Sequence, residues 1–275
     1  MNCRSQPSFP FALLRFSFLR ILPMWSAIAL VIFLMQIAVC AIVHDNQSVR
    51  TFLSFLDLLP SIVKSALGGQ NLQVGNISTL IAIGHSHPLV LFLCMFFAVG
   101  VPTALLTGEV EKGNMELVLS RPVTKTQVYV CAGILTLVGM FALVLVMFLG
   151  TVAGTNSYDF GEPIALGMFF RNAINGGLLA SAAGAVSLLA AAVFRGRNTA
   201  VGAAVAFLVV NYFVWLIAEW WPRMRFLKVL TLFHYVGGPK VVSGWPLGNM
   251  GVLTAVLLVA AISGGIIWQR RDLPL

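Results

Sequence analysis

Six apolar stretches constrain this chain more than any other feature of its sequence. They cover residues 24–43, 88–107, 128–150, 172–194, 199–218 and 250–268. A helix that crosses a bilayer needs about 20 apolar residues, and lipid offers no partners for backbone polar groups, so each stretch is predicted to be a helix. Only 9% of the residues are charged, against about 25% in soluble domains, which excludes a large soluble domain. The predicted fold is an all-α integral membrane protein, a single transmembrane domain over residues 1–275.

The distribution of Lys and Arg predicts how the chain is oriented. Cytoplasmic loops carry the excess of these residues. With both termini cytoplasmic, ten Lys and Arg lie inside and six outside. This excess also explains the net charge of +8 without invoking nucleic acid. We therefore expect a multi-pass protein of the cell (inner, cytoplasmic) membrane, with its lipids as partners.

Three segments outside the spans have amphipathic or aromatic character. Residues 9–20 combine aromatic and basic side chains, which is typical of a helix in the membrane interface. The outer loop 44–87 carries apolar residues at helical spacing between 52 and 67, which predicts an amphipathic helix that packs on the outer membrane face or on an outer partner chain. The outer segment 219–248 is too apolar for a solvated loop and too interrupted for a span, so short re-entrant helices are expected there.

The second cytoplasmic loop, residues 108–127, holds six of the 26 charged residues. Glu116, Leu117 and Leu119 predict a brief amphipathic helix in this loop. Pro122 should stop that helix, because proline disfavours helical geometry at the preceding Arg121. A short charged helix between two spans is suited to docking against another protein. The alternative interpretation of these residues is an ordinary solvated loop.

This loop resembles the signature of type-2 ABC transporter permeases, the export-class membrane subunits. In that family, an acidic residue, a Gly and a further Glu follow the second span. A Leu-rich stretch and a Ser/Thr-x-Pro-Val/Leu sequence come after them. The matching residues are Glu109, Glu111, Gly113, Glu116, Leu117, Leu119, Ser120, Pro122 and Val123. The chain has Lys125 where the family often has Arg, and Ala132-Gly133 where the family often has Gly-Lys. These departures bear on which subfamily the chain resembles more than on whether it resembles the family.

The resemblance implies a mechanical function for the loop. Its helix would sit in a groove of a separate ATP-hydrolysing subunit and carry the motion of that subunit to the spans. The residues so implied in ATPase coupling are Glu109, Glu111, Lys112, Gly113, Glu116, Leu117, Leu119, Arg121, Pro122 and Lys125. The sequence has no GxxxxGK[ST] motif, so no cofactor is expected in this chain and the partner would bind ATP and Mg²⁺.

Six spans would form half of a translocator. The expected partners are therefore two copies of an ABC ATPase subunit and a second permease copy or a paralogue. The complex would export a substrate, or it would use ATP to do mechanical work on an outer partner through residues 44–87. The sequence does not separate these two functions.

The polar residues raise two other classes of protein. A membrane-embedded enzyme could use His85 and His87 as metal ligands, but the sequence has no third ligand at a suitable spacing, no nucleophile elbow and no acidic dyad, so neither a metal site nor catalytic residues are predicted. An ion-coupled carrier needs ionisable groups in mid-membrane, and Arg171 is almost the only one. A possible intramembrane polar path, equally explained by hydrogen bonds between helices, comprises Arg171, Asn172, Asn175 and Asn211.

Overall fold

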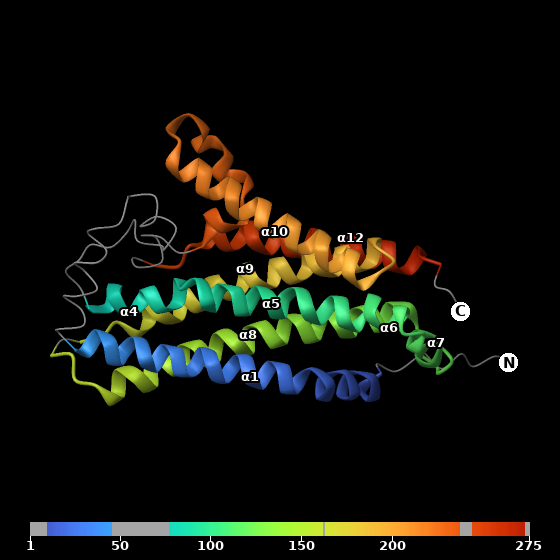
Figure 1. Ribbon diagram of the computed structural model, residues 1–275, viewed down its shortest axis with the longest axis horizontal. Helices are drawn as coiled ribbons and strands as arrows, with labels where there is room; N and C mark the ends of the chain where they lie inside the picture. The colour runs from blue at the N-terminus through green and yellow to red at the C-terminus, as the bar shows by residue number, and fades with distance from the viewer. Residues whose placement is uncertain (1–9, 46–76, 162, 237–243, 273–275) are drawn as a thin grey trace.

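The computed structural model describes residues 10–45, 77–161, 163–236 and 244–272, and these form helices joined by short turns (Figure 1). Six of the helices are long and apolar enough to cross a membrane. They are α1 (Phe11–His44), α5 (Pro88–Leu105), α8 (Lys125–Ser157), α9 (Leu166–Val193), α10 (Arg197–Trp220) and α12 (Leu247–Arg270). The predicted all-α membrane fold with six spans is thereby confirmed.

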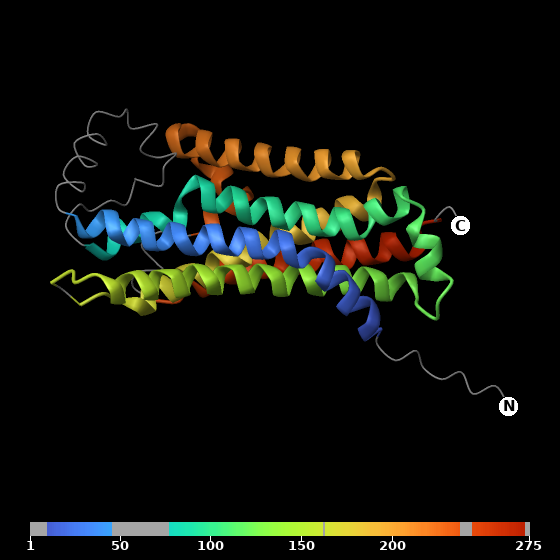
Figure 2. The ribbon, with the colours of Figure 1, turned by 60° about the horizontal axis from the view of Figure 1, so that its bottom comes forward.

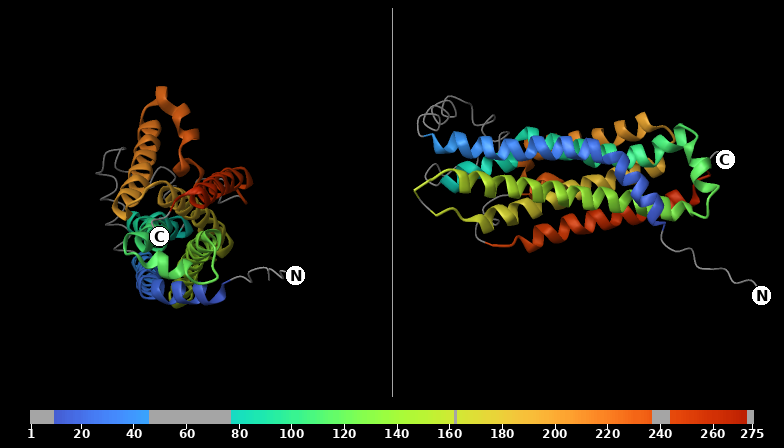
Figure 3. Two further views of the ribbon diagram at one scale, coloured as in Figure 1. Left: turned by 90° about the vertical axis from the view of Figure 1, so that its right-hand side faces the viewer. Right: turned by 90° about the horizontal axis from the view of Figure 1, so that it is seen from below.

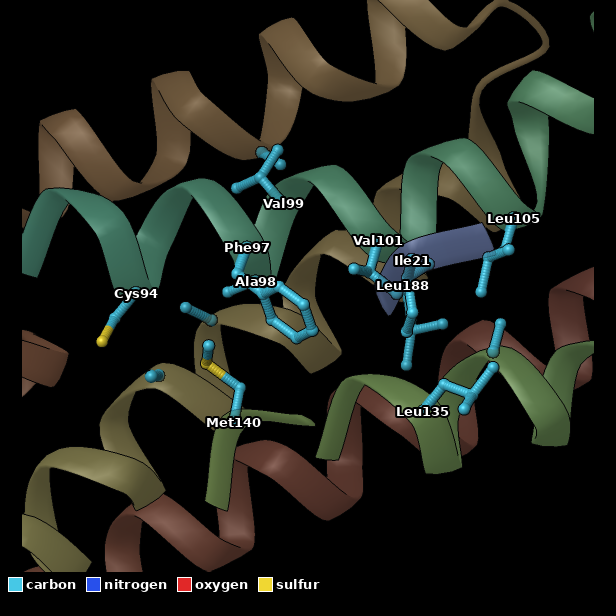
Figure 4. Packing of buried hydrophobic residues seen from close by; sticks show 14 of the residues in the cluster. Ile21, Cys94, Phe97, Ala98, Val99, Val101, Leu105, Leu135, Met140 and Leu188 are labelled. Carbon is cyan, nitrogen blue, oxygen red and sulfur yellow. The ribbon is translucent and has the colours of Figure 1, made fainter. Parts of the chain in front are cut away.

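α9 is the most deeply buried of the six spans. It packs against α5, α8, α10 and α12, while α1 packs mainly against α8. Seen end-on, α10 lies at the edge of the bundle and projects away from it (Figure 3). In the core, Phe97 of α5, Met140 of α8 and Leu188 of α9 are buried together (Figure 4).

Glycines allow α8 to approach its neighbours closely. A Cβ added at Gly154 would lie 2.6 Å from Cys40 Sγ on α1, and one at Gly150 would lie 2.9 Å from the carbonyl oxygen of Phe33. On α9, a Cβ at Gly184 would lie 2.7 Å from Thr136 Cγ2 on α8. Gly150 and Gly154 on α8 and Gly184 on α9 thus allow close helix packing, as small residues do at helix interfaces in membranes.

The predicted interfacial segment 9–20 is helical from Phe11, but it continues directly into the first span as one 34-residue helix. Pro23 lies inside this helix, and the part before it is bent away from the bundle axis (Figure 2). A proline removes a backbone donor and its ring crowds the preceding turn, which accounts for the bend.

The segment between α10 and α12 folds as two short 3-10 helices, η2 (Pro222–Leu230) and η3 (Leu232–Tyr235). Short helices were predicted here. η2 folds back along α10, and an ion pair between Glu219 of α10 and Lys228 of η2 joins the two helices. Whether the segment enters the membrane stays a prediction.

The outer loop differs from its predicted boundaries. Residues 77–86, placed in that loop from the sequence, form the short helix α4 (Ile77–Ser86), which packs on α1 immediately before α5. The amphipathic helix predicted over residues 52–67, and with it most of the surface for an outer partner, lies outside the described residues.

Candidate functional site

The loop between α5 and α8 contains two short helices, α6 (Thr107–Glu111) and α7 (Asn114–Leu119). Gly113 separates them at a φ of 72°, a left-handed conformation that glycine adopts without steric cost. The brief helix predicted around Glu116 is therefore confirmed, and it ends at Leu119, before Pro122. Both helices lie at the same end of the bundle as Phe11 of α1 and Arg270 of α12 (Figure 1). We call this end the α7 end.

Two carboxylates of α6 bind the rest of the bundle. Glu109 is buried and forms an ion pair with Arg20 of α1. Its second oxygen accepts a hydrogen bond from Asn114 Nδ2 at 3.1 Å, which joins α6 to the start of α7. Glu111 Oε2 accepts a hydrogen bond of 3.1 Å from the backbone N–H of Arg197, the first residue of α10. α6 is thus bound to α1 and to α10.

α7 has one buried side and one exposed side. Met115 is buried in the main core, and Val118 and Leu119 pack against that core. Leu117, by contrast, is 70% exposed. We define the exposed α7 surface as Lys112, Glu116, Leu117, Arg121 and Pro122, all of them exposed. The surface thus places one large apolar side chain among charged ones at the tip of the molecule.

The sequence reasoning missed the contacts that hold the start of α8. Trp268 Nε1 donates to the backbone oxygen of Lys125 at 3.0 Å, and Lys125 Nζ donates to the backbone oxygen of Arg271 at 2.8 Å. Arg271 donates in turn to the carbonyl oxygen of Ala191 in the last turn of α9 at 3.0 Å. Burial, followed by the charge of Arg195, lowers the pKa of Arg271. We call Lys125, Trp268 and Arg271 the C-terminal cluster; it joins α8, α9 and α12.

A capping box also fixes the first turn of α8. Gln127 N–H donates to Thr124 Oγ1 at 3.2 Å, and Thr124 N–H donates to Gln127 Oε1 at 2.9 Å. The Thr-x-x-Gln spacing is a recognised start signal for helices and could have been found in the sequence. It places the start of the third span at Lys125, three residues before the predicted boundary.

Eight of the ten residues predicted for ATPase coupling divide into two groups. Glu109, Glu111 and Lys125 bind other helices. Lys112, Glu116, Leu117, Arg121 and Pro122 form the exposed α7 surface. Gly113 makes the turn between α6 and α7, and Leu119 packs inward. Their function in coupling stays a prediction.

The four polar residues predicted along a path in the membrane do not share one cavity. Asn211 Oδ1 accepts from the Leu232 N–H at 2.9 Å, and Asn175 Nδ2 donates to the Tyr235 oxygen at 3.1 Å. These two residues thus hold η3 against α10 and α9. Asn172 lines a large cavity beside α5, and Arg171 is half-buried near the start of α9.

His85 and His87 lie close in sequence but make separate contacts. His85 is buried and stacks on Phe169 at a ring-centroid distance of 5.3 Å. His87 Nδ1 accepts from the Leu89 N–H at 3.2 Å and caps α5. No cluster of three or more His, Cys, Asp and Glu side chains is found within the described residues.

Six helices long and apolar enough to cross a membrane, with a short helical segment between the second and third of them, define a multi-pass membrane protein. The model of the ABC-2 family transporter proteins matches residues 15–273, so the chain belongs to this family of permeases. The resemblance to type-2 permeases is thereby confirmed over nearly the whole chain. No curated protein matches the chain.

Proposed function

We propose that this permease couples ATP hydrolysis by a separate ABC ATPase chain to export, and that the ATPase binds the exposed α7 surface. The observation that supports the proposal is the asymmetry of α7. Met115 is buried under it, whereas Leu117 and its charged neighbours project into solvent at the α7 end. An exposed leucine on a helix that the packed core supports can bury its apolar area against a partner without any rearrangement of the bundle.

The contacts of α6 and α8 would carry a displacement of α7 to every span. α6 follows α5 directly and is bound to α1 through Glu109 and to α10 through Glu111. Five residues separate α7 from α8, and α8 is joined to α9 and α12 by the C-terminal cluster. Because packed helices move as rigid elements, a push on α7 would tilt several spans together.

The complete transporter in this proposal contains two ATPase subunits, which bind ATP and Mg²⁺, and a second permease copy or a paralogue. In this proposal the chain lies in the inner membrane of the cell, and its α7 end faces the cytoplasm. The use of Asn175 and Asn211 for structural hydrogen bonds favours this function over an ion-coupled carrier. Mechanical work on an outer partner is the alternative outcome of the same coupling.

Purification of the full chain from its native host in mild detergent, followed by identification of its partners by mass, tests the proposal. We expect a stoichiometric soluble subunit that carries a GxxxxGK[ST] sequence and hydrolyses ATP. Recovery of the chain without such a subunit across several detergents would contradict the proposal and favour the enzyme or carrier alternatives.

A further inference from the structure

Two polar contacts join α4 to α1 and α8 at the end of the bundle opposite the α7 end (Figure 1). Gln36 of α1 is fully buried, and its Nε2 donates to the backbone oxygen of Gly84 on α4 at 3.2 Å. His85 follows Gly84 and is also buried, and its Nε2 lies 3.4 Å from Thr151 Oγ1 on α8. A titratable side chain therefore lies inside the contact between α4 and the spans.

On its other side, His85 lies against apolar groups. Its ring stacks on Phe169 of α9, and Phe169 belongs to a buried cluster that includes Ile81 of α4 and Cys40 of α1. Within the described residues, His85 Nδ1 has no hydrogen-bond partner and no ion pair involves His85. A neutral imidazole carries one N–H, whereas an imidazolium carries two and a full charge. These surroundings accommodate the neutral ring better than the charged one, because a buried charge without an anion is costly.

Burial determines the protonation state of His85. It lowers the pKa of His85 from its ordinary value of 6.5 to about 4, and an interaction with the Ile81 backbone opposes this effect only in part. Neither cause is a charged group, although α4 packs against α1, α5 and α9 and touches α8 through Thr151. The titratable and charged groups at this end of those elements, among the described residues, are Cys40, His44, Asp45, His87, Cys94, Tyr158, Asp159 and Arg171. His85 is thus neutral in the packed state because water is excluded from it.

We infer that protonation of His85 releases α4 from α1 and α8, which makes this contact sensitive to acid. An imidazolium regains its hydration when α4 leaves the bundle, whereas a neutral ring gains little. Because the released ring has its ordinary pKa, the packed state is fully favoured above about pH 6.5 and is progressively lost as the pH falls from there toward about 4. His85 also lines the cavity beside α5, which gives protons a route to the ring.

Release of α4 would affect the second span directly. α4 ends at Ser86 and α5 begins at Pro88, so only His87 separates the two helices. The contacts of Gln36 and His85 therefore hold this end of α5 in place through α4. The inference concerns α4 alone and does not depend on ATPase coupling.

The labelling of Cys40 by a thiol reagent tests this inference. Cys40 is fully buried in the cluster that contains Ile81 of α4, so departure of α4 uncovers it. Cys131 is 2% exposed and lies on α8 about 30 Å from Thr151 along the helix, so it serves as the internal reference. The full-length chain in detergent is treated with a dipyridyl disulfide, which also reacts with thiols in acid. Mass spectrometry of the peptides then gives the rate at each cysteine.

We expect the ratio of the Cys40 rate to the Cys131 rate to rise by up to about thirtyfold from about pH 7.5 to about pH 5, since the released ring takes up a proton over this range. In His85→Gln, which keeps a neutral polar group near Thr151, the ratio should not change with pH. Thr151→Val should label Cys40 faster near neutral pH and keep the response to acid. His87→Asn, at the exposed cap of α5, should respond like the wild type, because asparagine also caps helices.

Thermal unfolding near neutral pH checks that the variants fold. The inference is overturned if the wild-type ratio is the same at the two pH values, a comparison that needs no variant. It is also overturned if His85→Gln responds to acid like the wild type, because another group would then bind the proton. An equal rise at Cys40 and Cys131 would show that the whole bundle opens, and it would overturn a local release of α4.

Discussion

Replacement of both Glu116 and Leu117 by alanine should lower ATP-driven transport at least tenfold while the spans remain folded. Leu117 is 70% exposed and Glu116 is exposed beside it, so their truncation removes no packing within the chain. If one of the two side chains is a hot spot of the interface, its truncation costs about 2 kcal/mol, which corresponds to a loss of about thirtyfold in binding. The measurements are the amount of ATPase subunit that copurifies and the transport rate in reconstituted vesicles.

Leu230→Ala is the matched control for this double variant. Leu230 is 74% exposed and lies in η2, at the opposite end of α10 from the α7 end. It should copurify the ATPase like the wild type. Unchanged copurification and unchanged transport in the Glu116→Ala/Leu117→Ala variant would count heavily against coupling through α7.

The ion pair between α1 and α6 should produce a different defect. Arg20→Gln leaves the buried Glu109 carboxylate without its cation, and loss of one partner of a buried pair costs about 3–5 kcal/mol. Because the Arg20 side chain is 36% exposed, we expect a smaller loss, of about 2 kcal/mol. The exposed α7 surface is unaltered, so the ATPase subunit should still bind, while transport per ATP hydrolysed should fall severalfold.

A charge exchange distinguishes the pair from either residue alone. Arg20→Glu alone and Glu109→Arg alone should each lower the thermal stability and the coupling. The double variant, which restores an ion pair of opposite polarity, should regain the thermal stability and part of the coupling. If Arg20→Gln unfolds at the wild-type temperature and transports normally, the pair has no function in transmission. Equal defects in the single and the double exchange would show that these positions matter for some reason other than their mutual attraction.

The spans and α7 could be predicted from the sequence because their signals are local. Apolar length predicts a span, and the arrangement of Glu116, Leu117 and Pro122 predicts a short helix and its end. Boundaries were less accurate, since hydropathy marks the apolar part of a helix and not its ends. α8, for example, continues for seven residues beyond Gly150 into the polar sequence Thr155-Asn156-Ser157.

The contacts that hold the candidate site could not be predicted because they join residues far apart in the chain. Arg20 and Glu109 are 89 positions apart, and Trp268 and Lys125 are 143 apart. No spacing rule connects such pairs without the fold. The same reason explains why Asn175 and Asn211 suggested a path in the membrane, when each binds a backbone group of η3.

The most direct test of the central claim places a photo-activated cross-linking residue at position 117 of the full-length chain in native membranes. We predict a cross-linked product that contains a polypeptide with a GxxxxGK[ST] sequence, and no such product when the same residue stands at position 230. Cross-linking of that ATPase at position 230 only, or of no ATPase at position 117, would contradict the account.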